Sequence, residues 1–186
     1  MRYLLDKAAA LEVQPGRDIG HPSVWIPPPP KWYKINSDVA VRSDHSVCSA
    51  VGRDSQGVIV FATTTRVNVT EPSVGEALAL KEGLSQVLLR KLQPAVLESD
   101  CQELISTLQG SLQPAWNICS IVEEILLMAR CVGVIEFSYT PRSTNYLAHN
   151  LAKWADRHNV LGALDVNSIP DFVCNDFTLP DSILGD

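Results

Sequence analysis

The spacing of apolar side chains changes character along the chain. Residues 34–69 contain three runs rich in β-branched residues with polar turns between them, which predicts an antiparallel meander of three strands. Later segments combine helical spacing of three and four residues with two further short apolar runs. The predicted strands are 34–41, 46–52, 58–69, 95–99 and 132–139, and the predicted helices are 74–91, 100–109, one that begins at Pro114, and 143–158.

This order of elements predicts an α/β fold, because three consecutive strands followed by strand–helix alternation favour a mixed sheet with helices on its faces. We divide the chain into an N-terminal segment with a Pro-rich linker (1–30), one domain (31–158) and an acidic C-terminal tail (159–186). Four prolines between Trp25 and Trp32 indicate an extended, semi-rigid spacer, or alternatively a ligand for an aromatic groove.

Composition agrees with a folded intracellular domain. The 186 residues are 46% hydrophobic and 19% charged, enough to bury a core. We expect neither a membrane span nor a secretory signal, since the apolar runs are short, and we expect a cytoplasmic or nuclear protein. The five cysteines show no C-x-x-C pairing and are expected to be reduced thiols.

The net charge of −6 is unevenly distributed. The predicted tail carries five Asp and no Lys or Arg, whereas residues 31–158 have a net charge of only −1. Charge therefore neither favours nor excludes a polyanionic partner for the domain.

Three acidic residues stand where catalytic groups are common. Asp38 lies within an otherwise apolar or small strand, Glu76 near the start of the first long helix, and Asp100 at the carboxyl end of the fourth strand. Taken singly, they could be a satisfied buried carboxylate, a charge favoured by the helix dipole and a helix N-cap. Taken together they favour one site, because the first and fourth strands can be neighbours beneath that helix.

The last predicted helix has two faces. Leu147, Leu151 and Trp154 mark the buried one. The opposite side carries a polar stripe with spacings of three and four residues, which is either functional or simply solvated. This polar stripe consists of Arg142, Asn145, His149 and Lys153.

Five motifs recur in order along the chain and together resemble a known family. They are Trp-x-Pro-Pro-Pro-Pro-x-Trp-x-Lys-Ile-Asn-x-Asp (25–38), Val-Gly-Arg-Asp-x-x-Gly (51–57), Glu-Ala-x-Ala-Leu (76–80), Glu-Ser-Asp-Cys (98–101) and Arg-x-x-Asn-x-x-Ala-His-x-Leu-Ala (142–152). The chain from Trp25 to Arg157 thus resembles the ribonuclease H-type domain common in plant proteins related to non-LTR retrotransposons.

The resemblance implies a five-stranded mixed sheet flanked by helices on both faces, and a hydrolase that cleaves the RNA strand of RNA–DNA hybrids. It implies that Asp38, Glu76 and Asp100 hold two Mg²⁺ ions, with Mn²⁺ as a substitute. His149 would assist catalysis, and Arg142 and Asn145 would touch the phosphate backbone or 2′-hydroxyls of the nucleic acid.

Two positions depart from the family pattern. His149 stands where well-characterised ribonucleases H have a fourth acid, and Val39 follows the first Asp where Gly is usual, so its side chain is expected to crowd the substrate. These departures favour an alternative: a catalytically weak or inactive ribonuclease H-like domain that binds nucleic acid or protein. A purely structural domain is a third possibility.

Overall fold

The computed structural model describes residues 24–174; residues 1–23 and 175–186 lie outside the described part, with most of the N-terminal segment and the end of the acidic tail. The described elements are β1 Tyr33–Val41, β2 Ser46–Arg53, β3 Ile59–Val67, α1 Pro72–Arg90, β4 Ala95–Ser99, α2 Gln102–Leu108, α3 Cys119–Val132, β5 Ile135–Tyr139, α4 Tyr146–His158, β6 Gly162–Ala163 and the 3₁₀ helix η1 Val166–Ser168.

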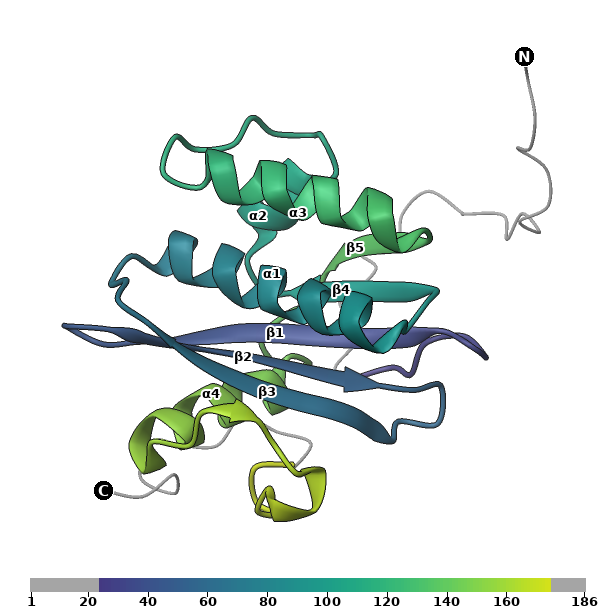
Figure 1. Ribbon diagram of the computed structural model, residues 1–186, viewed down its shortest axis with the longest axis vertical. Helices are drawn as coiled ribbons and strands as arrows, with labels where there is room; N and C mark the ends of the chain where they lie inside the picture. The colour runs from purple at the N-terminus through teal and green to yellow at the C-terminus, as the bar shows by residue number, and fades with distance from the viewer. Residues whose placement is uncertain (1–23, 175–186) are drawn as a thin grey trace, which may run out of the picture.

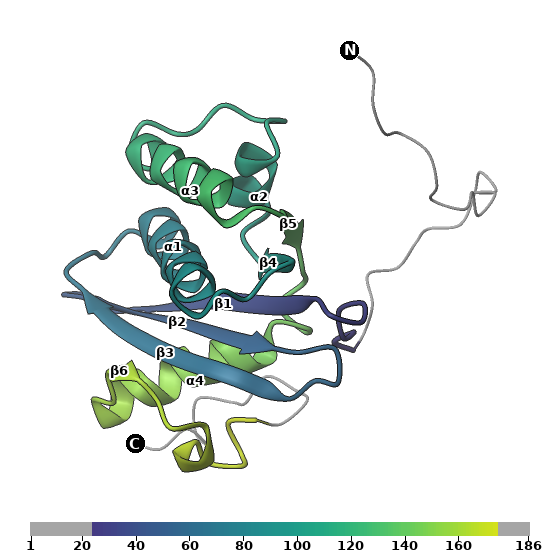
Figure 2. The same cartoon turned by 45° about the vertical axis from the view of Figure 1, so that its right-hand side comes forward.

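The strands form one mixed sheet in the order β5-β4-β1-β2-β3-β6. β1, β2 and β3 pair antiparallel, as the meander predicted, while β4 pairs parallel with both β1 and β5. Helices α1, α2 and α3 cover one face of the sheet, and α4 covers the other (Figure 1). Figure 2, turned by 45°, shows the same arrangement of helices on both faces of the sheet. No helix within residues 24–174 is both long and apolar enough to cross a membrane.

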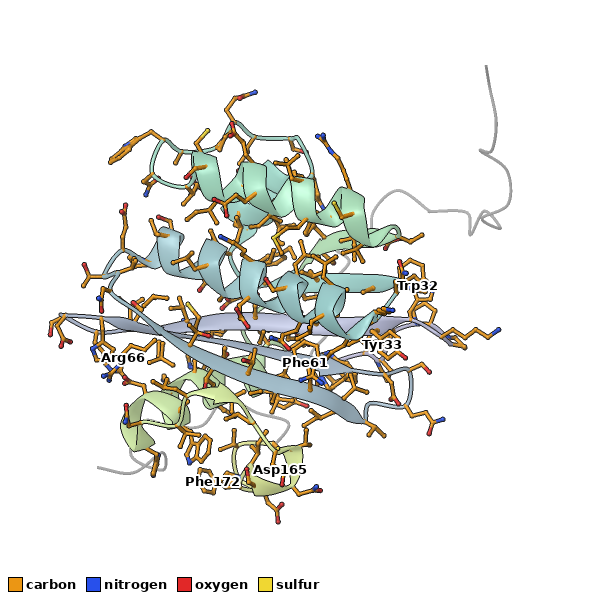
Figure 3. All side chains as sticks on the ribbon, viewed as in Figure 1. Trp32, Tyr33, Phe61, Arg66, Asp165 and Phe172 are labelled. Carbon is orange, nitrogen blue, oxygen red and sulfur yellow. The ribbon has the colours of Figure 1, made fainter. Side chains whose placement is uncertain are left out.

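The face beneath α1 holds the larger apolar core. Leu84 of α1 is fully buried against Ile35 and other apolar side chains of the sheet. The approach is close: a Cβ added to Gly83 would lie 2.9 Å from Ile35 Cγ2. Phe61 lies on this side as well (Figure 3), and its ring fills the space above Gly52, where an added Cβ would be 2.2 Å away. The apolar side of α1 therefore lies against the sheet.

The sheet has six strands where five were expected. The short β6 pairs antiparallel with β3, joining Ala163 to Thr63 and Gly162 to Thr64. Two residues are too few to produce the alternation by which a strand is recognised in a sequence. The expected count of five is therefore wrong, although the mixed sheet and the helices on both faces are confirmed.

The packed structure also runs past residue 158, where we placed the start of the tail. Ile169 and Val173 are buried in a cluster with Val51 of β2 and Trp154 of α4. Asp165 and Phe172 lie on this α4 side of the sheet (Figure 3). Apolar side chains there come in short groups, such as Val160 with Leu161 and Phe172 with Val173, separated by Gly, Asp, Asn and Pro, which interrupt a helix or strand pattern. The first part of the predicted tail thus completes the α4 side.

Three predicted starts shift by three residues or more: the start of α4 moves from Ser143 to Tyr146, which leaves Asn145 just before that helix, and two others lie away from the site. The helix expected from Pro114 begins at Cys119, and the side chain of the preceding Asn117 donates a hydrogen bond of 2.6 Å to Glu71. The strand expected from Val132 begins at Ile135, because α3 continues through Val132 and the chain then turns at Gly133 with φ +111°. Neither of these two shifts moves the candidate site residues.

Candidate active site

Three carboxylates converge at the point where β4 ends beside β1. The last parallel pair between these strands joins Asn36 to Glu98. Asp38 therefore lies beyond the end of the pairing, and Asp100 comes directly after β4. Glu76, one turn into α1, reaches the same point, so that all three residues offer ligand oxygens within 4.8 Å of one another. The expected convergence of residues 62 positions apart occurs.

Close packing of α1 on β1 makes this convergence possible. A Cβ added to Gly75 would lie 2.9 Å from Val39 Cγ2, so only glycine allows the start of α1 to approach so near. Val39 packs against this part of α1 with Ala79 and is only 7% exposed. It lines the cavity described below, but most of its side chain is occupied by α1 and little remains to crowd a ligand.

His149 joins the three acids from the opposite face of the sheet. It lies on α4, and its Nδ1 is 2.6 Å from Asp38 Oδ2. The other Asp38 oxygen accepts a hydrogen bond of 2.8 Å from the backbone N–H of Val39. The side chain of His149 is buried although it lies opposite Leu147 and Leu151 on α4, and it lines a cavity. The alternative of a solvated stripe is wrong at this position.

Burial and mutual repulsion make the acidic cluster unfavourable without a cation. Desolvation and the charges of Asp38 and Asp100 hold the pKa of Glu76 well above its ordinary value. Desolvation and the Asp38 charge also raise the pKa of Asp100, and the nearby Arg142 guanidinium partly opposes this. Ser99 donates a 3.3 Å hydrogen bond to Glu76. A bound divalent cation would replace this repulsion with attraction, which is what a metal site requires.

Basic side chains surround the cluster. Arg42, Arg142 and Lys153 line a cavity of about 310 Å³ together with Glu76 and His149. Sequence reasoning did not identify Arg42. It follows β1, which ends at Val41, and its Nε donates a 2.6 Å hydrogen bond to Asp156 Oδ2 on α4, so no strand alternation in the sequence points to it. The cavity thus places Glu76 of the acidic cluster beside a basic rim, as a phosphodiester bound through cations would require.

Arg142 is more than half exposed at 60%, and its Nε lies 3.8 Å from Asp100 Oδ2. Its terminal nitrogen is also 3.0 Å from His149 Nδ1. When His149 Nδ1 carries the proton of its hydrogen bond to Asp38, Nδ1 has no lone pair left to accept a hydrogen bond from Arg142. The guanidinium can then donate to another acceptor at the rim of the cavity.

Asn145 does not lie where a nucleic acid could touch it. It is fully buried; its amide donates a 2.9 Å hydrogen bond to the Ser37 carbonyl, and its oxygen accepts one of 3.1 Å from Asn36. Its expected contact with the phosphate backbone is therefore not supported. The residue precedes α4 but gives that helix no side-chain cap, since its side chain binds β1 instead.

Comparison with known proteins places this geometry in a family. A family model described as reverse transcriptase-like matches residues 36–155, and no curated protein matches the sequence. LC11-RNase H1, isolated from compost, is 18% identical with a TM-score of 0.64 over 69% of this chain and 99% of its own. The N-terminal RNase H domain of a Mycobacterium tuberculosis protein is 17% identical with a TM-score of 0.63, over 68% of this chain and 94% of its own.

RNase H1 from Halobacterium salinarum is 20% identical with a TM-score of 0.60, over 68% of this chain and 98% of its own. A further structure shows LC11-RNase H1 in complex with an RNA/DNA hybrid; it is 18% identical with a TM-score of 0.56 over 61% of this chain and 88% of its own. At such identities the likeness establishes the fold, which is that of ribonuclease H.

Proposed function

Since the chain belongs to the reverse transcriptase-like family and has the ribonuclease H fold, we propose that it is a metal-dependent endonuclease that cleaves the RNA strand of RNA–DNA hybrids. The observation that carries this proposal is the convergence of Asp38, Glu76 and Asp100 within 4.8 Å beside a cavity with a basic rim. The hybrid bound by LC11-RNase H1 supports the choice of substrate. The motifs suggest a plant, retrotransposon-related protein that acts in the cytoplasm or nucleus.

The donor atoms fit a hard cation. Three carboxylates offer only oxygen ligands, which suit Mg²⁺ and also Mn²⁺. Asp38, Glu76 and Asp100 would hold the ions, with Asp38 kept in place by His149 and by the Val39 N–H. When bound, paired cations supply an acidified water and charge stabilisation for in-line cleavage of a phosphodiester.

The remaining residues act on the substrate and on the position of Asp38. Arg142 and Lys153 line the cavity and attract phosphate groups by charge, while the neighbouring Arg42 is ion-paired with Asp156. His149 Nδ1 lies 2.6 Å from Asp38 Oδ2, where it can donate a hydrogen bond to the carboxylate and so orient it. It thereby takes the place of a fourth carboxylate without adding negative charge to the cluster.

The alternative proposal is a ribonuclease H-like domain that binds nucleic acid or protein and cleaves little. One contact favours it: His149 occupies Asp38 Oδ2, an oxygen that a cation would need. In this case the basic rim would bind a nucleic acid without subsequent chemistry.

A cleavage assay separates the two proposals. The full chain is incubated with a labelled RNA–DNA hybrid in Mg²⁺, in Mn²⁺ or in EDTA, with an RNA duplex and a DNA duplex of the same sequence as controls. We expect cleavage of the RNA strand of the hybrid alone, supported by either ion and abolished by EDTA. Tight hybrid binding without cleavage in any ion would overturn the nuclease proposal and support the alternative.

A further inference from the structure

The segment before β1 contacts the domain mainly through Trp25. The indole Nε1 of Trp25 donates a 3.2 Å hydrogen bond to Asn36 Oδ1, and the Arg53 guanidinium lies 3.5 Å from the centre of a Trp25 ring. The neighbouring Ile26 carbonyl accepts a 2.7 Å hydrogen bond from Lys34. The segment that the sequence suggested to be a spacer is thus packed against the start of the sheet.

Asn36 connects this segment to the rest of the α4 side. Its Oδ1 accepts from Trp25 and, at 2.8 Å, from Arg53. Its Nδ2 donates to Glu98 at 2.9 Å and to Asn145 at 3.1 Å. A side-chain amide has two donors and two lone pairs, so every position on Asn36 is used. Its orientation therefore depends on all four partners at once, and Asn36 is fully buried.

Asn145 links Asn36 to the active site through hydrogen bonds. It is bonded to Asn36 and to the Ser37 carbonyl, and its own carbonyl accepts from the backbone N–H of His149 at 3.1 Å. The imidazole of that residue is bonded in turn to Asp38. A series of hydrogen bonds, buried except for the partly buried bond at Trp25, therefore joins Trp25 to the backbone of His149, whose imidazole contacts the proposed metal ligand Asp38.

We propose that Trp25 is a positioning residue for the active site, acting through Asn36 and Asn145 to set the start of α4 and so the contact between His149 and Asp38. This inference rests on the proposed function for its catalytic consequence. Trp25 lies outside the residues 36–155 matched by the family model, so it extends the functional unit beyond the family domain. Positioning by buried hydrogen bonds is effective because a partly satisfied network loses its fixed geometry.

The full chain carrying Trp25→Phe tests the bond from the indole N–H. Phenylalanine keeps an aromatic ring beside Arg53 but has no N–H for Asn36. We expect kcat for hybrid cleavage to fall roughly two- to tenfold, the effect of one lost hydrogen bond, with KM unchanged. The matched control is Trp32→Phe, since the Trp32 indole makes no hydrogen bond recorded within residues 24–174, and it should leave both constants unaltered. A fall in both variants alike would indicate general loosening of the segment and overturn the proposal.

A double-substitution cycle tests the route. In a His149→Ala background the imidazole is absent, so Trp25→Phe should have no further effect on kcat. If Trp25→Phe lowers kcat by the same factor in both backgrounds, the residue does not act through His149 and the proposal fails.

A measurement without catalysis keeps the inference separate from the proposed function. In EDTA, the Nδ1 proton of His149 and the amide protons at the start of α4 can be followed by NMR and hydrogen exchange. Trp25→Phe should shift the Nδ1 resonance and speed exchange at His149, whereas Trp32→Phe should do neither. An unaltered resonance overturns the positioning role even if the protein cleaves hybrids. A shifted resonance in a protein that cleaves nothing upholds the positioning and overturns only the nuclease proposal.

Discussion

The two faces of the sheet are buried in different ways. Beneath α1, α2 and α3 the buried side chains are almost all apolar, with Leu80, Leu84 and Ile125 fully enclosed. Beneath α4 an apolar cluster lies beside a set of fully or nearly fully buried polar groups that bond one another. The groups that bond one another are Asn36, Arg53, Asn145 and, through its backbone N–H, His149, while the buried Ser49 donates to the Ala148 carbonyl of α4. The face beneath α1 stabilises the fold by apolar packing, and the face beneath α4 holds side chains in fixed orientations next to the acids.

The difference teaches when hydrophobic periodicity is informative. On α1 a polar position is an exposed or half-buried one, so the apolar stripe identifies the inner face. On α4 the same argument fails, because Asn145 and His149 lie off the apolar stripe and yet are buried. Their burial is tolerated because each has partners: Ser37 and Asn36 for Asn145, and Asp38 for His149.

The largest expected effect comes from Asp38→Asn, on the polar side. It removes the charge of a proposed metal ligand while keeping its shape, so hybrid cleavage should fall by at least about two orders of magnitude, as when one electrostatic stabiliser of a transition state is lost. Rates are compared with those of Glu82→Gln, which alters an acid on α1 outside the cluster and should be silent. Equal loss in both variants would mean that bulk charge, and not this site, supports cleavage.

On the apolar side, Leu84→Ala should lower stability without touching the chemistry. The side chain is fully buried, and truncating a buried leucine costs about 2–5 kcal/mol of unfolding free energy. Urea unfolding measures this loss, and kcat per folded molecule should stay unchanged. Asn145→Ala sharpens the contrast: it leaves buried groups unbonded at a cost of about 1–3 kcal/mol but should also lower kcat. The comparison between the faces breaks down if Leu84→Ala lowers kcat as much as Asn145→Ala does.

The same division explains how much the sequence predicted. The strands and helices that position Asp38, Glu76 and Asp100 follow from period and turn residues, and the three acids do meet. The roles of Asn145 and Trp25 could not be predicted, because a hydrogen-bond partner 109 or 11 residues away leaves no local pattern. The short β6 was missed because two residues make no period, and the buried Val173 was missed because Pro170 and Asp171 interrupt the pattern before it.

A smaller effect is expected from Glu76→Gln, through the dependence of stability on pH. The pKa of Glu76 is raised by burial and by the neighbouring acids, so the folded protein keeps this proton to a higher pH than the unfolded chain does. The stability that this retained proton contributes is fully present below pH 4.5, the ordinary pKa of a Glu, and is lost as pH rises through the raised pKa. In EDTA, the Tm of the wild type should fall as pH rises over this range, and the Tm of Glu76→Gln should fall less.

Thermal unfolding between pH 4 and pH 8 checks this expectation, with Glu82→Gln as the matched control on the same helix. The two Gln variants should differ most near neutral pH and least at acidic pH, and added Mg²⁺ should stabilise the wild type more than Glu76→Gln. Parallel Tm profiles for the wild type and Glu76→Gln would show that repulsion within the cluster is not a significant cost.

A change in rate smaller than that of Asp38→Asn, and of opposite sign, is expected at His149, where the two faces meet. His149→Asp places a fourth carboxylate beside Asp38, and a hard oxygen is a better ligand for Mg²⁺ than a ring nitrogen. Cleavage at saturating Mg²⁺ should rise a few-fold, and the Mg²⁺ concentration for half-maximal rate should fall. Without a cation the substitution should lower Tm, because it replaces the 2.6 Å contact with Asp38 by repulsion inside a buried cluster.

His149→Asn, which adds no charge, should lower Tm less and leave the Mg²⁺ dependence close to that of the wild type. A fall in rate for both variants would instead show that the imidazole itself transfers a proton during cleavage, and Mg²⁺ curves identical to that of the wild type for both would remove His149 from the active site.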